Sequence, residues 1–223
     1  MKLTGKRCWI VGATGAIGSV VAQKFLEEDA VVLTDRVDVL HALKIEKLIE
    51  YLQPDILINC SGILGSVGPV HKTSTYSWRR VIEVNLIGSY NLTQAVLPRM
   101  IQNKAGKIIH FSGGGAAYGR PFYSAYAASK AGLVRFVESV AEEVEPFNIQ
   151  INTIAPGAVK SKMNPEAVGT ADSAAALAVF LASDESGNVT GRLISALHDR
   201  WSVNIDGLSE EAGKLRRIPF TNA

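Results

Sequence analysis

A tyrosine and a lysine four residues apart could transfer a proton in this protein. Tyr126 and Lys130 fall in a stretch whose apolar residues have helical spacing, and a separation of four places both side chains on one helix face. A phenol with a pKa of about 10 is a poor acid or base at neutral pH. A neighbouring ammonium group stabilises the phenolate and lowers that pKa. The pair could serve in general acid–base catalysis, although the same spacing is common in helices without a catalytic role.

A glycine-rich loop near the start of the chain could bind phosphate. The loop follows an apolar, strand-like run at residues 7–11 and precedes an apolar helical stretch. Glycine lets the backbone turn tightly and approach a pyrophosphate, and a helix that begins there offers free N–H groups and a favourable dipole. This position between a strand and a helix is the context that such a loop requires. The loop therefore predicts a dinucleotide site, formed by Gly12, Thr14, Gly15, Ala16, Ile17 and Gly18.

Two charged residues at the end of the second predicted strand bear on the type of dinucleotide. Asp35 lies 17 residues after Gly18, near the distance at which an acidic residue meets the adenosine ribose. A carboxylate there accepts from the ribose hydroxyls and repels a 2′-phosphate, which favours NAD. Arg36 acts in the opposite direction, because a guanidinium could pair with that phosphate. The alternative is a strand-end turn with two solvated charges.

Short apolar runs alternate with longer helical segments along the whole chain. Runs of about five nearly continuous apolar residues are typical of parallel strands buried on both faces. Their alternation with helices predicts an α/β fold: a doubly wound parallel sheet of the Rossmann type in a single three-layer α/β/α domain over residues 1–197. Residues 198–223 would form a tail that packs near the active site. The predicted strands are 7–11, 30–33, 55–59, 107–111, 149–154 and 192–196, and the predicted helices are 16–28, 39–52, 75–103, 124–145 and 171–182.

The composition excludes several classes of function. The chain has 223 residues with 23 basic and 21 acidic side chains, so its formal charge of +2 gives no reason to expect nucleic-acid binding. No apolar run approaches the roughly 20 residues that span a bilayer, and we expect no membrane association and, by default, a cytoplasmic location. Cys8 and Cys60 lie in apolar runs as free thiols, and no Cys or His cluster has metal-ligand spacing. We expect no metal site.

Taken together, five motifs resemble those of the short-chain dehydrogenase/reductase family. They occur in the family's order and cover the chain from the first strand to about Ala196. The motifs are GATGAIG at 12–18, NCSG at 59–62, VNLIG at 84–88, YAASK at 126–130 and APG at 155–157.

The resemblance implies an oxidoreductase that transfers a hydride between a nicotinamide and a carbonyl or alcohol carbon. The cofactor would be NAD, with NADP as the alternative. Tyr126 would be the general acid in reduction and the base in oxidation. Lys130 would bind the nicotinamide ribose and lower the pKa of Tyr126. Asn85 would hold a water in a proton relay through Lys130.

Further residues would touch or support the cofactor according to the same resemblance. Asn59 would brace the sheet beside the adenosine, and Ser61 and Gly62 would pass close to the cofactor. Pro156 and Gly157 would pass close to the nicotinamide, although a Pro-Gly pair also ends many strands as a simple turn.

Three segments depart from the pattern of single-domain family members. The loop reads G-x-x-G-x-x-G, where such members usually have G-x-x-x-G-x-G. The region from Asp35 to Asp55 is too short for one helix of the ordinary fold, and residues 38–39 could be a remnant of a third strand. The substrate lid after Gly157 is shortened to residues 158–170, which would leave the site more open.

The fourth departure concerns the catalytic serine. The family's serine usually lies 13 residues before the tyrosine, and that position is Gly113 here. Three glycines follow Ser112, so the backbone could shift there. We therefore predict that the Ser112 hydroxyl polarises the reacting carbonyl, with Ser124 as the reserve candidate.

Three readings of the function stay open at this point. The leading one is a reductase or dehydrogenase of a polar small molecule, with a carbohydrate or nucleotide-sugar as the candidate substrate. The second is a 3-oxoacyl-thioester reductase. The third is a cofactor-binding protein with lost or weak turnover, which Gly113 favours and the presence of Tyr126, Lys130 and Asn85 disfavours.

Apolar residues on more than one face of the predicted helices 75–103 and 124–145 suggest self-association. Val134, Phe136, Val137 and Val140 of the second helix exceed what one sheet contact needs. We expect a homodimer or homotetramer. Trp201 in the tail needs cover, and with a short lid we expect the tail to help close the active site.

Overall fold

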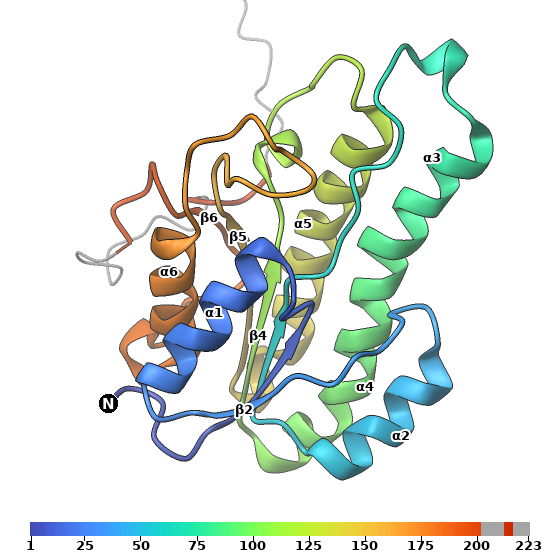
Figure 1. The fold of residues 1–223 in the computed structure, drawn as a ribbon. Helices are drawn as coiled ribbons and strands as arrows, with labels where there is room; N and C mark the ends of the chain where they lie inside the picture. Colours follow the sequence, from blue (N-terminus) through green and yellow to red (C-terminus); the bar gives the residue numbers. More distant parts are fainter. Residues whose placement is uncertain (202–211, 216–223) are drawn as a thin grey trace, which may run out of the picture.

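Six parallel strands form the centre of the molecule (Figure 1). The computed structural model describes residues 1–201 and 212–215. The strands are β1 (Arg7–Val11), β2 (Val31–Leu33), β3 (Ile56–Asn59), β4 (Gly106–Phe111), β5 (Ile149–Ala155) and β6 (Leu193–Ser195). The main helices are α1 (Ala16–Glu27), α2 (Ala42–Leu52), α3 (Thr75–Ile82), α4 (Gly88–Asn103), α5 (Ser124–Val144) and α6 (Asp172–Ala182).

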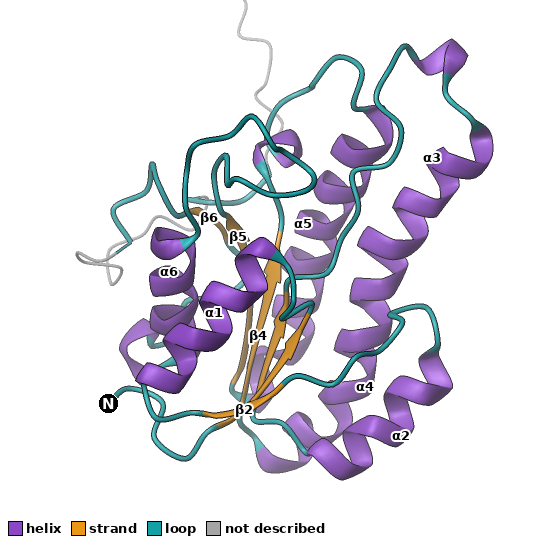
Figure 2. Cartoon of the chain, in the orientation of Figure 1, coloured by secondary structure: helices purple, strands orange, loops and turns teal. Residues whose placement is uncertain are grey.

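The strand order is β2-β1-β3-β4-β5-β6, and every neighbouring pair is parallel. Helices α1 and α6 cover one face of the sheet, and α2, α4 and α5 cover the other (Figure 1). The predicted doubly wound, three-layer fold is confirmed. The order of the chain reverses direction between β1 and β3, and ligands of open α/β sheets bind at the carboxyl ends of the strands beside such a switch point. The long loops gather at that end of the sheet, at the top of Figure 2.

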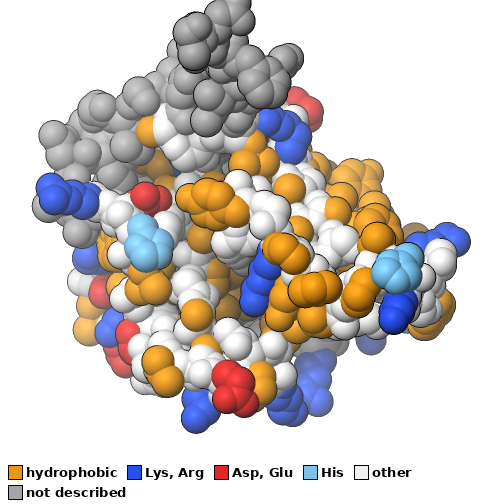
Figure 3. Space-filling view, turned by 90° about the horizontal axis from the view of Figure 1, so that it is seen from above, with side chains coloured by type: hydrophobic (Ala, Val, Ile, Leu, Met, Phe, Trp, Pro, Cys, Tyr) orange, Lys and Arg blue, Asp and Glu red, His pale blue; other side chains and the backbone are white. Residues whose placement is uncertain are grey.

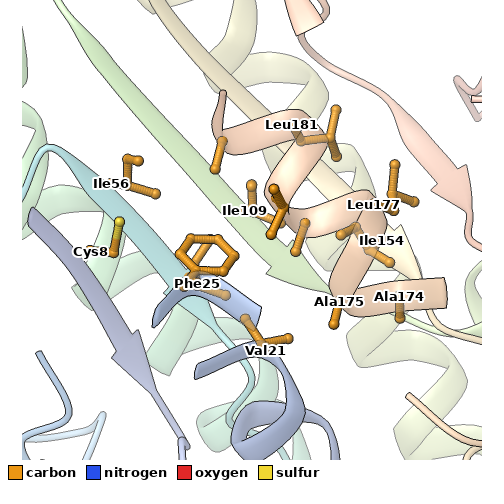
Figure 4. Packing of buried hydrophobic residues seen from close by; sticks show 14 of the residues in the cluster. Cys8, Val21, Phe25, Ile56, Ile109, Ile154, Ala174, Ala175, Leu177 and Leu181 are labelled. Atoms are coloured by element: carbon orange, nitrogen blue, oxygen red, sulfur yellow. The ribbon is translucent and has the colours of Figure 1, made fainter. Parts of the chain in front are cut away.

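Alternation along each strand supplies two apolar layers. Cys8 and Ile10 of β1 face α1 and α6, whereas Trp9 and Val11 face α2, α4 and α5. Figure 4 shows the first layer, in which Phe25 of α1 lies over the sheet beside the small side chains of α6. Burial in this layer raises the pKa of the Cys8 thiol to about 12, so Cys8 is a packing residue, as predicted from its apolar surroundings.

The expected remnant of a third strand at residues 38–39 is not a strand. The Oδ1 atom of Asp38 accepts a hydrogen bond from the N–H of Leu40 at 3.0 Å and closes a turn. Val39 is buried over Gly88, where a Cβ atom would lie 2.4 Å from the Val39 Cγ2. The carbonyl of Val39 accepts from the side chain of Asn91 at 2.9 Å. The segment is therefore fixed as a turn, helix α2 begins only at Ala42, and β2 is the edge of the sheet.

The predicted helix over 75–103 exists with one irregularity. Helices α3 and α4 are joined without a break by a π-helical turn at Glu83–Ile87. Such turns are often found at functional sites. This one carries Asn85, whose side chain is buried and directed at the loop that follows β3.

The described parts of the tail lie against the outer side of β6, α5 and α6. The Leu193 N–H donates to the carbonyl of Gly213 at 2.7 Å, and Glu138 of α5 accepts from the Leu215 N–H at 2.5 Å. Trp201 packs on Phe180 of α6, with ring centroids 5.8 Å apart. Residues 202–211 and 216–223 fall outside the described part of the chain.

Across the described ranges, no helix combines the length and apolar character needed to cross a membrane.

Candidate active site

A cavity of about 740 Å³ opens at the carboxyl ends of β1, β3, β4 and β5. Figure 3 views this face from above and shows it hollowed near the centre. The cavity extends from the glycine loop after β1, past residues 60–62 after β3, to the first turns of α5. A second cavity of about 520 Å³ adjoins it and is lined by residues 12–14 and 34–38. Together they form an elongated space at the switch point of the sheet.

The glycine loop has the close approaches for which glycine is required. Gly12 has a φ of +79°, and a Cβ atom there would lie 3.0 Å from the main chain of Cys60 and Ser61. At Gly18 a Cβ atom would lie 2.2 Å from the carbonyl oxygen of Gly12. Helix α1 begins directly after Gly15, and its first turn has no acidic residue.

These features fit a nicotinamide dinucleotide. Thr14, Gly15, Ala16 and Ile17 all line the larger cavity, so the N-terminus of α1 faces the space where a pyrophosphate would receive its N–H groups. Gly18 does not line either cavity and instead allows α1 to pack closely on the loop.

Asp35 and Arg36 are both exposed and both line the smaller cavity beside Gly12 and Thr14. The two residues therefore lie at one end of the space, where the sequence predicts the adenosine of the cofactor. The Asp35 carboxylate suits the ribose diol of NAD, and the Arg36 guanidinium suits the 2′-phosphate of NADP. Their placement alone is therefore compatible with either cofactor.

Tyr126 and Lys130 lie on consecutive turns of α5, with the Lys130 Nζ atom 5.8 Å from the centroid of the Tyr126 ring. Both line the larger cavity. The Lys130 ammonium donates to the carbonyl of Phe111 at the end of β4, at 2.7 Å. Burial lowers the pKa of Lys130 to about 8, with Cys60 opposing weakly. Lys130 thus still carries its charge at neutral pH, close to the carboxyl end of the sheet.

The pKa of Tyr126 moves in the direction opposite to the one expected. Burial raises the pKa of the phenol, and the positive charge that opposes this shift is that of Arg120, not that of Lys130. Desolvation of the phenolate outweighs the opposing effect of Arg120, so the lowering of this pKa that was expected from Lys130 is not present in this structure. Tyr126 is therefore protonated at neutral pH and suited to donate a proton.

The Asn85 side chain clamps the main chain that follows β3. Its Oδ1 accepts from the Ile63 N–H at 2.8 Å, and its Nδ2 donates to the Ile63 carbonyl at 2.9 Å and to the Ser129 hydroxyl at 3.0 Å. A Cβ atom at Gly62 would lie 3.2 Å from the Asn85 Oδ1 and 3.5 Å from the Lys130 Nζ, so the two groups converge there. Its predicted part in a water relay stays a prediction.

Asn59 lies beneath the cavity in a buried network that sequence reasoning missed. Its Oδ1 accepts from the N–H and the hydroxyl of Ser61 at 3.0 and 2.5 Å. Its Nδ2 lies 3.0 Å from the Ser89 hydroxyl and 3.2 Å from His110 Nδ1, while His110 Nε2 lies 2.9 Å from the Thr93 hydroxyl. Since Asn59 donates to Nδ1, the proton of the neutral ring belongs on Nε2. The Ser89 hydroxyl continues the chain to the Asn85 carbonyl at 2.8 Å.

The signals that could have found this network are polar residues in apolar runs. His110 is fully buried in β4, and Ser129 is fully buried in α5. Buried polar groups need hydrogen-bond partners, but the partners come from other elements, which the sequence does not place.

The position that faces the Tyr126 hydroxyl is Gly113. A Cβ atom there would lie 3.2 Å from the phenolic oxygen. Ser112 is buried, and its hydroxyl lies 3.5 Å from the main-chain carbonyl of Lys130. Ser112 also lines the larger cavity. Its N–H donates to the Ile154 carbonyl at 2.8 Å and keeps the strand direction, and its predicted use to polarise a carbonyl stays a prediction. The reserve candidate Ser124 accepts from the Trp78 indole at 3.2 Å and does not line the cavity.

The opposite wall of the cavity comes from the segment after β5. Pro156 and Gly157 line it, and the Leu197 side chain covers Gly157 from behind, where a Cβ atom would lie 2.3 Å away. The short lid at 158–170 has no helix and is held by a bridge between Val159 and Gly169. Val159, Ser161, Met163 and Asn164 of this lid line the cavity.

Among the described tail residues, none lines the larger cavity. Trp201 instead covers α6, and its indole donates to the Ala196 carbonyl at 3.3 Å. The predicted closure of the site by the tail therefore concerns residues outside the described part, and it stays a prediction.

Comparison with known proteins agrees with this site. The family described as short chain dehydrogenase matches residues 34–171. The chain is 32% identical to the 3-oxoacyl-[acyl-carrier-protein] reductase FabG of Thermotoga maritima, over 87% of this chain and 97% of that protein. It is 34% identical to the acetoacetyl-CoA reductase of Shinella zoogloeoides, over 64% of this chain and 66% of that protein. The aldohexose dehydrogenase structure of Thermoplasma acidophilum superposes with a TM-score of 0.80 at 23% identity, covering 86% of this chain and 92% of that one.

The chain therefore belongs to the short-chain dehydrogenase/reductase family and is an NAD(P)-dependent oxidoreductase.

Neutral His110 makes the stability of this fold sensitive to acid. Burial, with a smaller effect of the Lys130 charge, lowers the pKa of His110 from 6.5 to about 3. Between these values the unfolded chain binds a proton that the folded chain does not, so the free energy of unfolding falls as the pH falls through this window. His110→Asn should remove up to about 1.4 kcal/mol per pH unit from that slope.

The measurement is urea unfolding at several pH values between neutrality and the acid limit of solubility. His71→Asn is the matched control, because His71 is exposed, and its slope should equal that of the wild type. An unchanged slope in His110→Asn would show that His110 titrates normally in the folded chain.

Proposed function

We propose that this enzyme transfers a hydride between a nicotinamide cofactor and the carbonyl or hydroxyl carbon of a polar small molecule, with a carbohydrate or nucleotide-sugar as the leading candidate. The observation that carries the proposal is the placement of Tyr126 and Lys130 in one cavity with the glycine loop. Polar groups on the substrate side of Tyr126, among them Tyr123, Ser161 and Asn164, support a polar substrate.

In this proposal each residue of the site has a separate role in the reaction. The nicotinamide supplies the hydride acceptor or donor. Tyr126 gives its proton to the carbonyl oxygen in reduction and takes one in oxidation. Lys130 holds the ribose and keeps a positive charge near the phenol, and Asn85 fixes the floor of the site at Ile63.

A second candidate is the reduction of a 3-oxoacyl thioester. The names of the Thermotoga maritima and Shinella zoogloeoides relatives favour it. A third, a cofactor-binding protein with weak turnover, is favoured by the glycine that faces Tyr126. A panel of sugar-nucleotides and acetoacetyl-CoA, followed through the absorbance of the reduced nicotinamide, separates the three.

Tyr126→Phe should abolish turnover of the active panel member while cofactor affinity stays within about twofold. The ring still packs, but the proton is gone, and general acid–base catalysis contributes roughly 10²–10⁴-fold. Stopped-flow absorbance gives the rate and fluorescence titration gives the affinity. Activity within about threefold of the wild type would contradict the assignment.

Ser112→Ala and Gly113→Ser test which position serves the carbonyl. If Ser112 were the polarising group, its loss would lower kcat by roughly 10²-fold or more. The geometry instead predicts a loss below about threefold, together with a gain for Gly113→Ser, whose hydroxyl would stand beside Tyr126. Steady-state kinetics of both variants decides between the two positions. A large loss of kcat in Ser112→Ala, without a gain in Gly113→Ser, would show that Ser112 polarises the carbonyl.

We further propose that NADH binds more tightly than NADPH. Asp35 lies at the adenosine cavity, where its carboxylate repels a 2′-phosphate. Fluorescence titration of both cofactors measures the preference, and Asp35→Ser should narrow it. A clear preference of the wild type for NADPH would mean that Arg36 dominates.

We also propose a homodimer or homotetramer, but the apolar surface available for self-association is smaller than the sequence suggested. Val134, Val137 and Val140 are buried in the chain itself, so they supply no second face. Ile87 and Tyr90 of the π turn and α4 remain about half exposed at 46% and 49%, and Tyr90 meets Phe136 of α5 edge-on at 6.2 Å. Light scattering at micromolar concentration should give a multiple of the chain mass. Tyr90→Lys should reduce this measured mass. A wild-type monomer would refute the proposal.

A further inference from the structure

Among the residues that the structure describes, the larger cavity is lined by charged side chains of one sign only. Of the residues that line it, Lys130 and Arg120 are charged, and neither Asp nor Glu is among them. Acidic side chains lie toward the margin of the face in Figure 3, whereas a basic side chain lies beside its central hollow. Lys130 is engaged deep in the site by the Phe111 carbonyl. Arg120 is therefore the other charged side chain among the described lining residues, and it is the one that we consider for binding a substrate.

Arg120 is held in place without a carboxylate partner. Its guanidinium carbon lies 3.8 Å from the centroid of the Tyr123 ring, a cation–π geometry. Among the described residues, no acidic side chain forms an ion pair with it. A guanidinium stacked on a ring keeps its N–H groups in the plane of the fork. The donors of Arg120 are thus available to a ligand.

Two main-chain hydrogen bonds anchor the loop at and after Arg120. The Tyr123 N–H donates to the Arg120 carbonyl at 3.2 Å, and the Phe122 carbonyl accepts from the Gly68 N–H at 2.9 Å. Arg120 and Tyr126 line the same cavity, and the Arg120 charge opposes the rise in the pKa of Tyr126. A ligand held by Arg120 would therefore occupy the cavity that Tyr126 also lines.

We propose that Arg120 is a specificity-determining residue that binds an anionic group of the substrate, a phosphate or a carboxylate. The inference rests on the proposed function and narrows its substrate class. A planar guanidinium presents paired N–H donors that match two oxygens of either anion. No Asp or Glu is among the described lining residues, so none of them would repel such an anion.

Two pairs of probes separate the anion from the rest of the ligand. Acetoacetyl-CoA carries phosphates, whereas acetoacetyl-N-acetylcysteamine has the same keto thioester without them. Acetoacetate carries a carboxylate that ethyl acetoacetate lacks. Binding of each to the wild type, saturated with NADH, is measured by isothermal titration calorimetry.

The wild type should bind at least one anionic probe more tightly than its neutral counterpart. Arg120→Gln should weaken the binding of that anionic probe by about tenfold or more, which is the usual effect of losing a charged hydrogen-bond pair. The binding of the neutral probe should be unchanged. Arg120→Lys should retain part of the preference. Arg79→Gln is the matched control, because Arg79 is an exposed arginine of α3 outside the cavity.

Three results would overturn the proposal. The first is that the wild type binds neither anionic probe more tightly than its neutral counterpart. The second is that Arg120→Gln weakens the binding of charged and neutral probes equally. The third is that Arg120→Gln loses affinity for NADH, which would assign Arg120 to the cofactor. Oxidation of NADH by the probes is recorded separately. Binding that depends on Arg120 without any turnover would contradict the proposed function and leave this inference intact.

Discussion

The contact of two backbones at the switch point of the sheet is the constraint on which the site depends. The loop after β1 lies so close to the end of β3 that a side chain at Gly12 would meet the main chain of Cys60 and Ser61. A second close approach, between Gly18 and the Gly12 carbonyl, sets where α1 begins. Because both contacts exclude a Cβ atom, the N-terminus of α1 and the end of β3 share one cavity wall, and a dinucleotide can touch both.

A buried hydrogen-bond network transmits this arrangement to the reacting end of the cavity. It runs from Thr93 through His110 and Asn59 to Ser89 and ends at the carbonyl of Asn85. Satisfied networks of this kind select one arrangement of the elements around them, because each buried group left unpaired costs free energy. The π turn that holds Asn85 is thus tied to the strand that carries the cofactor-facing loop.

The chemistry of the site follows from charges placed in a poorly solvated cavity. Burial raises the pKa of Tyr126 and lowers that of Lys130, so each group favours its neutral form more than it would in water. Arg120 is the nearby charge that counteracts this effect at Tyr126. Where the family's serine would stand, Gly113 leaves space beside the phenol. No side chain at that position can therefore polarise a substrate carbonyl.

The sequence by itself determined the order of strands and helices, the glycine loop and the Tyr126–Lys130 pair, because these depend on local periodicity and on fixed spacing within one helix or turn. Only the tertiary structure decided which elements meet. It buried Val134, Val137 and Val140 in the chain's own core, turned Ser112 toward Lys130, and joined His110 to Asn59. It also set the direction of the Tyr126 pKa, since desolvation depends on every element packed around the phenol and not on the neighbour four residues away.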